Sequence, residues 1–131
     1  MEVRRPRVLI VEDEPLVVVD LEDSLTDLGY RVVEKARNLV DGLIFAQELD
    51  LDVAVLEVNL AGLTSTKIAE LLDEKGVPFL LVTGYTTSGI PERLRNSLRV
   101  GKPFENAELG QALQELLGAK APANRSSQPL E

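Results

Sequence analysis

The residues that could carry chemistry in this chain are carboxylates, a hydroxyl and an ammonium group, each placed at the end of a short apolar run. They are Glu12, Asp13, Glu57, Thr83 and Lys102. Carboxylates gathered at one place repel one another, and a hard divalent cation or a lysine ammonium relieves that repulsion. A cation, a lysine and a hydroxyl around a carboxylate also suit phosphoryl transfer, in which the carboxylate is the nucleophile.

These residues can act together only if the fold brings them together, and the sequence pattern indicates how it would. Apolar runs that predict buried strands alternate with helical patterns. The expected strands cover residues 7–11, 30–34, 52–57, 77–83 and 98–100, and the expected helices cover about 15–28, 38–49, 65–76, 91–95 and a final stretch through 117. Pro15 is suited to the first turn of a helix, Asn38 and either Thr64 or Ser65 to N-caps, and Gly29 and Gly76 to helix ends.

Alternating strands and helices predict an α/β domain with a doubly wound parallel sheet of five strands. The carboxyl ends of parallel strands lie at one edge of the sheet, where ligands of such folds bind. The five residues named first should therefore meet at that edge. Residues 1–117 are expected to form this domain, and the polar residues 118–131 a disordered C-terminal tail.

Composition limits the classes of function. The chain has 131 residues, no Cys, no His and a formal net charge of -8. Disulfides, zinc sites built on Cys or His, and His-based catalysis are excluded, so any metal must be held by oxygen. The acidic balance argues against nucleic-acid binding, and no run is long enough to cross a bilayer. We therefore expect a cytoplasmic protein.

Four motifs give the chain a resemblance to the receiver domains of two-component response regulators, the CheY-like family. They are Val8-Leu9-Ile10-Val11-Glu12-Asp13-Glu14-Pro15, Leu56-Glu57-Val58-Asn59-Leu60-Ala61-Gly62, Val82-Thr83-Gly84 and Lys102-Pro103-Phe104. Each follows or ends a predicted strand, and together they cover residues 7–117. The resemblance implies the strand order 2-1-3-4-5. Thr83-Gly84-Tyr85 is also similar to a motif of stand-alone receivers.

The resemblance also implies roles for the site residues. Glu12 and Asp13 would bind Mg²⁺ directly or through water, Asn59 would add its backbone carbonyl, and Glu57 lies at the phosphoacceptor position beside the metal. Thr83 would hydrogen-bond the phosphoryl group, and Lys102, followed by a cis peptide bond, would form an ion pair with it. The implied partners are a histidine kinase or histidine phosphotransfer protein and a downstream protein target, and members of the family also form homodimers.

The sequence departs from the family at two positions. The phosphoacceptor is normally Asp, and the extra methylene of Glu57 moves the carboxylate roughly 1.5 Å further along the side chain. The second departure is Arg99, which stands where receivers usually carry Tyr or Phe. We hypothesise that Glu57 makes the site insensitive to ordinary Asp phosphorylation and biased toward the active state.

Other interpretations of the same residues remain open from the sequence. Glu57 could simply pair with Lys102 in the absence of a metal. A Mg²⁺-dependent phosphatase of the dehalogenase type shares the sheet edge, although it needs Asp-x-Asp where this chain has Glu12-Asp13-Glu14. A flavodoxin-like binder of flavin or nucleotide would need a phosphate loop where these acids lie.

Overall fold

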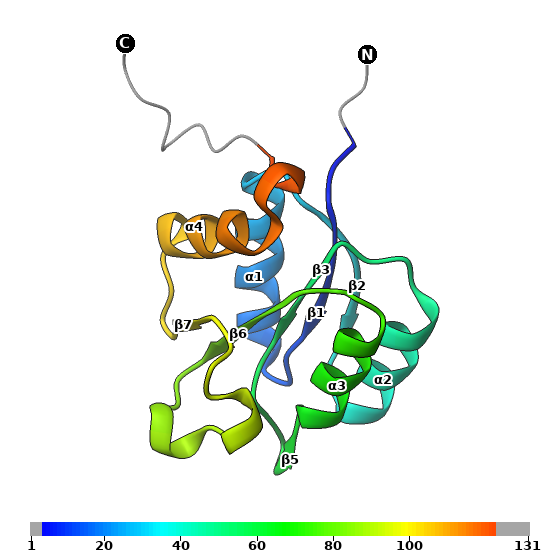
Figure 1. Cartoon of the computed structure of the whole chain (residues 1–131). Coiled ribbons are helices and arrows are strands. Elements are labelled where there is room, and N and C mark those ends of the chain that lie inside the picture. The colour runs from blue at the N-terminus through cyan, green and yellow to red at the C-terminus, as the bar shows by residue number, and fades with distance from the viewer. Residues whose placement is uncertain (1–3, 123–131) are drawn as a thin grey trace.

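The computed structural model describes residues 4–122 and contains one central sheet of five strands (Figure 1). The strands are β1 (Arg7–Val11), β2 (Arg31–Ala36), β3 (Val53–Leu56), β6 (Phe79–Thr83) and β7 (Arg99–Gly101). All neighbouring pairs are parallel, and the order across the sheet is β2-β1-β3-β6-β7. This is the predicted order 2-1-3-4-5, because β6 and β7 are the fourth and fifth strands of this sheet. The predicted α/β fold is confirmed.

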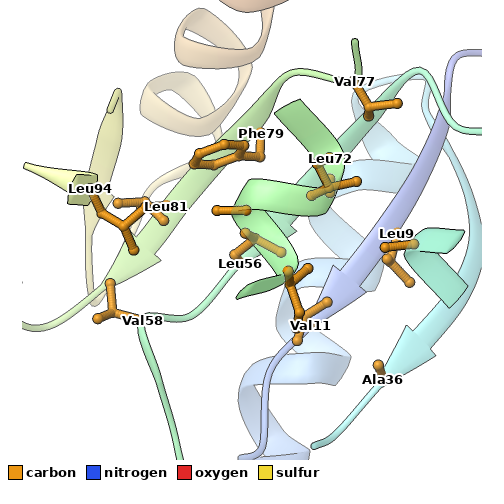
Figure 2. Close-up of a cluster of buried hydrophobic side chains, with 14 of the residues drawn as sticks. Leu9, Val11, Ala36, Leu56, Val58, Leu72, Val77, Phe79, Leu81 and Leu94 are labelled. Atoms are coloured by element: carbon orange, nitrogen blue, oxygen red, sulfur yellow. The ribbon is translucent and has the colours of Figure 1, made fainter. Parts of the chain in front are cut away.

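Helices cover both faces of the sheet (Figure 1). One face carries α1 (Pro15–Asp27) and α4 (Asn106–Leu117), and the other carries α2 (Leu39–Glu48) and α3 (Thr66–Glu74). Successive residues of a strand point to opposite faces, so β1 and β3 contribute to two separate hydrophobic cores. Figure 2 shows the core beneath α3, in which Leu56, Val58 and Leu81 are buried. Within the described residues, no helix has the length and apolar character needed to span a membrane.

Most of the predicted helix ends are present. Pro15 occupies the first turn of α1, and the Asn38 side chain accepts a hydrogen bond from the Asp41 amide at 2.8 Å. Gly29 and Gly76 follow α1 and α3 with φ of 97° and 72°, in the region that glycine adopts without steric cost. Ser65 is the N-cap residue of α3, but its side chain makes no capping hydrogen bond. The helix start was therefore predicted correctly, and the side-chain cap was not.

A short hairpin follows β3 and was not predicted as a hairpin. Its strands are β4 (Asn59–Leu60) and β5 (Leu63–Thr64), and they pair antiparallel. The connecting residues Ala61 and Gly62 both have positive φ, 53° and 93°, which is the backbone of a tight two-residue turn. The Asn59 side-chain oxygen accepts from the Gly62 amide at 2.7 Å and braces the turn. The hairpin therefore fixes the backbone directly after Glu57.

The connection between β6 and β7 contains two 3₁₀ turns, Thr87–Gly89 and Glu92–Leu94. The short helix predicted over 91–95 is one of these turns, with Pro91 as its N-cap residue. Ile90 and Leu94 are nevertheless buried in the core beneath α3. The segment thus covers the end of the sheet with little regular structure.

The tail was expected to begin at residue 118, and the structure describes the chain through residue 122. Gly118–Lys120 forms a further 3₁₀ turn after α4. The Gln114 side-chain nitrogen donates to the Pro122 carbonyl at 3.4 Å, and Pro122 lies against Gly29 at the end of α1. These contacts keep the chain on the domain surface beyond Leu117. The remaining positions, 123–131, lie outside the described residues.

Replacing Gly42 by alanine is expected to destabilise the fold, although alanine is the better helix former by about 1 kcal/mol. A Cβ at this position of α2 would lie 2.5 Å from the Cδ1 atom of Ile68, which is fully buried in α3. Overpacking of this kind costs about 1–3 kcal/mol. Urea denaturation should show a net loss for Gly42→Ala and a smaller effect of the same change in an Ile68→Val background, which lacks Cδ1. Equal effects in the two backgrounds would contradict this packing.

Candidate functional site

The predicted site residues meet at the carboxyl edge of the sheet, and backbone hydrogen bonds hold the strand ends in register there. The Glu12 amide donates to the Ala36 carbonyl, and the Glu57 amide donates to the Val11 carbonyl, both at 2.9 Å. The Lys102 amide donates to the Thr83 carbonyl at 3.1 Å. These bonds link the ends of β2, β1 and β3 to one another, and the ends of β6 and β7 to each other, at the same edge. The juxtaposition predicted from the strand ends is present.

The centre of the site is the Lys102 ammonium, which lies between two buried carboxylates. Its Nζ atom is 2.7 Å from Glu12 Oε1 and 2.6 Å from Glu57 Oε1. The exposed fractions of the side chains are 15% for Lys102, 1% for Glu12 and 7% for Glu57. Burying an unpaired charge would cost several kcal/mol, so these groups depend on one another. A third carboxylate, that of the exposed Glu14, lies 3.6 Å away.

The second oxygen of each buried carboxylate is also engaged. Glu57 Oε2 accepts from the Val58 amide at 2.5 Å and from the Asn59 amide at 3.3 Å. Glu12 Oε2 accepts from the Glu14 amide at 3.1 Å. Because the Val58 side chain is buried in the core shown in Figure 2, the amide that holds Glu57 is itself fixed. Ammonium on one side and backbone amides on the other therefore set the position of the Glu57 carboxylate.

The environment of this cluster raises the pKa of two of its groups, Glu12 and Lys102. Burial raises the pKa of the Glu12 carboxyl above its ordinary value, and the contacts with Lys102 and the Glu14 amide offset only part of that rise. For Lys102, burial alone would lower the pKa, but the ion pairs with Glu12 and Glu57 outweigh burial and raise it above 10.5. The stability that protonated Lys102 contributes is therefore complete below pH 10.5 and is lost as the pH rises through the raised value.

A cleft of about 370 Å³ opens beside Glu57 and Lys102. Its walls also include Asp13, Glu14, Asn59 and Tyr85. Glu12 is not part of the wall, and its side chain is almost completely buried. Within residues 4–122 no cluster of three or more His, Cys, Asp or Glu is placed to hold a metal. Magnesium needs only one or two carboxylates when waters fill its other positions, so Asp13, Glu57 and Asn59 fit a hydrated Mg²⁺ and not a closed cage.

The other predicted site residues lie nearby but make different contacts. Thr83 is 1% exposed at the end of β6, and its hydroxyl accepts from the Tyr85 amide at 3.2 Å. No hydrogen bond joins that hydroxyl to Glu57 in the described part of the chain. The Lys102–Pro103 peptide bond is cis, as the resemblance implied. Asn59 stands at the cleft wall and uses its side chain in the hairpin turn.

Two residues in the site were missed or left without a role. Glu14 was treated only as part of an acidic run, yet it approaches Lys102 and lines the cleft. The sequence feature that could have indicated this role is the position of Glu14 directly before Pro15, between the end of β1 and the start of α1. Arg99, noted only as a departure from the family, donates from Nη2 to the Thr87 hydroxyl at 2.5 Å. Arg99 therefore stabilises the β6–β7 connection through this hydrogen bond and does not form an aromatic contact.

The fold and this set of strand-end residues define a signalling domain of the receiver type, and a family comparison agrees. The model of the response regulator receiver domain matches residues 8–114, so the chain belongs to that family. The family consists of signalling domains and not of metabolic enzymes. The phosphatase and flavin-binding interpretations are therefore set aside.

Two relatives of known identity are similar to most of this chain. The chain is 30% identical over 122 residues to the phyllosphere-induced regulator PhyR of Methylorubrum extorquens, covering 90% of this chain and 46% of PhyR. The solution structure of SdrG from Sphingomonas melonis is 35% identical with a TM-score of 0.78, covering 86% of this chain and 97% of SdrG. The chain spans about half the length of the curated relatives it matches.

A third similar structure bears on the metal. The receiver domain of the sensor histidine kinase PA1611 from Pseudomonas aeruginosa has a magnesium ion coordinated in its active-site cleft. It is 25% identical to this chain, with a TM-score of 0.76, and covers 88% of this chain and 99% of that domain. Magnesium is therefore bound by a structural relative at the cleft that the fold provides.

Replacing Lys102 by methionine is expected to lower the free energy of unfolding by about 3 kcal/mol at neutral pH, because two buried carboxylates lose their counter-ion. Adding Glu57→Gln to Lys102→Met should restore part of the loss, since one unpaired charge is removed. Lys67→Met, on the exposed side of α3, is the matched control and should change stability by less than about 0.5 kcal/mol. Urea denaturation measures all three. Indistinguishable curves for the two methionine variants would contradict the ion-pair arrangement.

Proposed function

We propose that this chain is the receiver module of a two-component phosphorelay, with Glu57 holding the site in a state that does not require Asp phosphorylation. The observation that carries the proposal is the 2.6 Å contact between Glu57 and Lys102. In the family the corresponding lysine forms an ion pair with the phosphoryl group. Here a carboxylate of the chain itself supplies the negative charge for that contact.

The imitation of a phosphoryl group is partial. Glu57 carries one negative charge, compared with roughly 1.5 to 2 for a phosphate at neutral pH. Its carboxylate reaches Lys102, whereas the Thr83 hydroxyl is hydrogen-bonded to the Tyr85 amide. We infer that the module is biased toward its active form by the lysine contact alone.

The same contacts oppose phosphorylation of Glu57. Both of its oxygens are already bound, one by an ammonium and the other by backbone amides. The longer side chain also displaces the nucleophile roughly 1.5 Å from the position of an aspartate oxygen. Misplacement by about 1 Å can reduce a reaction rate about 100-fold. Transfer to Glu57 should therefore be slow even in the presence of a competent donor.

Magnesium would be held by Asp13, Glu57 and the backbone carbonyl of Asn59, with Glu12 acting through water or through Lys102. When bound, the ion would neutralise charge on an incoming phosphoryl group. The residues of the chain have separate tasks: Lys102 balances the charge of Glu57 and Glu12, and the Val58 amide orients the carboxylate. The acidic walls of the cleft would attract the cation.

The proposed partners are proteins. A histidine kinase or histidine phosphotransfer protein would contact the site edge, and a downstream protein would read the state of the domain, in the cytoplasm. A homodimer is a further form in which the module could act. In one similar structure PhyR from Bartonella quintana is described as an anti-anti-sigma factor, and that description is compatible with a protein partner here.

A labelling experiment tests the proposal. The wild-type chain, Glu57→Asp and Glu57→Gln are incubated with radiolabelled acetyl phosphate and Mg²⁺. We expect labelling of Glu57→Asp to exceed that of wild type by about 100-fold or more, with wild type close to the Glu57→Gln blank. Circular dichroism establishes that the variants are folded. Stable, Mg²⁺-dependent labelling of Glu57 in the wild-type chain would overturn the proposal.

A further inference from the structure

A second cavity, of about 310 Å³, lies between the β4–β5 hairpin and the connection from β6 to β7. These two parts of the chain lie next to each other at the lower edge of the molecule in Figure 1. The lining is unlike that of the acidic cleft, because none of its residues is acidic. The lining residues are Val58, Asn59, Thr64, Tyr85, Ser88, Gly89, Ile90, Pro91 and Arg95. A volume of this size suits the insertion of one side chain or a small ligand.

Arg95 is the charged group of this cavity, and one hydrogen bond orients its exposed side chain. Its Nε atom donates to the Ile90 carbonyl at 2.8 Å. Its two terminal nitrogens, which carry four of the five guanidinium N–H groups, have no protein partner within residues 4–122. Its neighbours differ: Arg93 forms a 2.9 Å ion pair with Glu70, and Arg99 donates to Thr87. Arg95 is therefore a guanidinium at the cavity wall that is oriented by Ile90 and has no carboxylate partner among the described residues 4–122.

The surroundings favour a carboxylate over a phosphate. A guanidinium binds a carboxylate through two parallel hydrogen bonds, and one positive charge balances one negative charge. Phosphate groups carry more charge and are usually held by clusters of Arg, whereas Arg95 is the one cation in this lining. The hydroxyls of Thr64 and Ser88 form hydrogen bonds with the Thr66 and Thr86 hydroxyls, and each can donate to a ligand oxygen while it accepts from that neighbour. Val58, Ile90 and Pro91 offer an apolar wall for the methylene groups of a side chain.

We propose that this cavity binds a glutamate or aspartate side chain from an acidic segment of a partner protein, with Arg95 as the anion-binding residue. The surface exists because two short turns replace a regular helix between β6 and β7, which leaves space beside the hairpin. The segment from Ile90 to Arg99 carries three arginines and only one acid, Glu92, in a chain whose net charge is -8. This local excess of positive charge favours the binding of an acidic partner at this part of the surface.

The test is an amide NMR titration of the full chain with the peptide acetyl-Ala-Glu-Ala-amide. Its neutral counterpart contains Gln, and a third peptide contains phosphoserine. We expect saturable shifts of the Thr64, Ser88, Gly89 and Ile90 amides with the Glu peptide and at least five-fold weaker effects with the Gln peptide. Arg95→Lys, which keeps the charge but loses the paired hydrogen bonds, should weaken binding at least three-fold. Arg93→Gln is the matched control and should change affinity by less than two-fold.

Thr64→Glu provides a variant that leaves the Ile90–Arg95 contact in place. The introduced carboxylate would belong to the lining of the same cavity and should pair with Arg95, which would abolish binding of the Glu peptide. Equal shifts with the Glu and Gln peptides, or equal losses in the Arg93 and Arg95 variants, would overturn the proposal. Tighter binding of the phosphoserine peptide by ten-fold or more would assign the cavity to phosphorylated partners and overturn it also. None of these outcomes depends on whether Glu57 accepts a phosphoryl group.

Discussion

The arrangement of the site depends on one interaction, the contact of the Lys102 ammonium with the carboxylates of Glu12 and Glu57. The three charges come from the ends of β1, β3 and β7, so the sheet must hold these ends together for the contact to form. The requirement also runs in the other direction, because two nearly buried carboxylates at adjacent strand ends would repel one another without a cation between them. Backbone amides complete the arrangement, because they donate hydrogen bonds to the second oxygen of each carboxylate and so hold it in place. Fold stability and site geometry therefore rest on the same atoms.

This arrangement explains how the carboxylate of Glu57 is accommodated at the end of β3 without disrupting the domain. The longer side chain carries its charge to the lysine, and the Val58 amide binds the other oxygen. The resemblance to receiver domains implies that the lysine of a typical member is instead available to a phosphoryl group. The proposed consequence is a module whose output does not require phosphorylation. The second cavity, with Arg95 at its wall, is separated from this centre but shares Asn59 and Tyr85 with the acidic cleft. A partner bound there would therefore contact residues that also form the wall of the site.

Apolar runs and glycine stops such as Gly29 and Gly76 are local signals, and they were sufficient to predict the strands and the meeting of the strand-end residues. The strand order was implied by the resemblance to receiver domains. Features without a periodic pattern, whether local turns or contacts between distant segments, were missed. The β4–β5 hairpin uses Ala61 at positive φ, which the turn imposes against the preference of alanine. The turns after β6 have no periodic pattern, although Ile90 and Leu94 are buried. The approach of Glu14 to Lys102 and the fastening of Thr87 by Arg99 depend on long side chains whose direction no spacing rule predicts.

The central claim is that the ion pairs outweigh burial at Lys102, and the ionisation of that side chain tests it most directly. Selective ¹³C labelling of lysine side chains allows the Cε signal of Lys102 to be followed by NMR as the pH is raised, with Lys102→Met identifying the signal. The two physical effects have opposite signs, since burial lowers the pKa of an ammonium and neighbouring carboxylates raise it. The account predicts that Lys102 titrates above pH 10.5. A midpoint below 10.5 would show that burial dominates, and it would contradict the arrangement of Lys102 between Glu12 and Glu57.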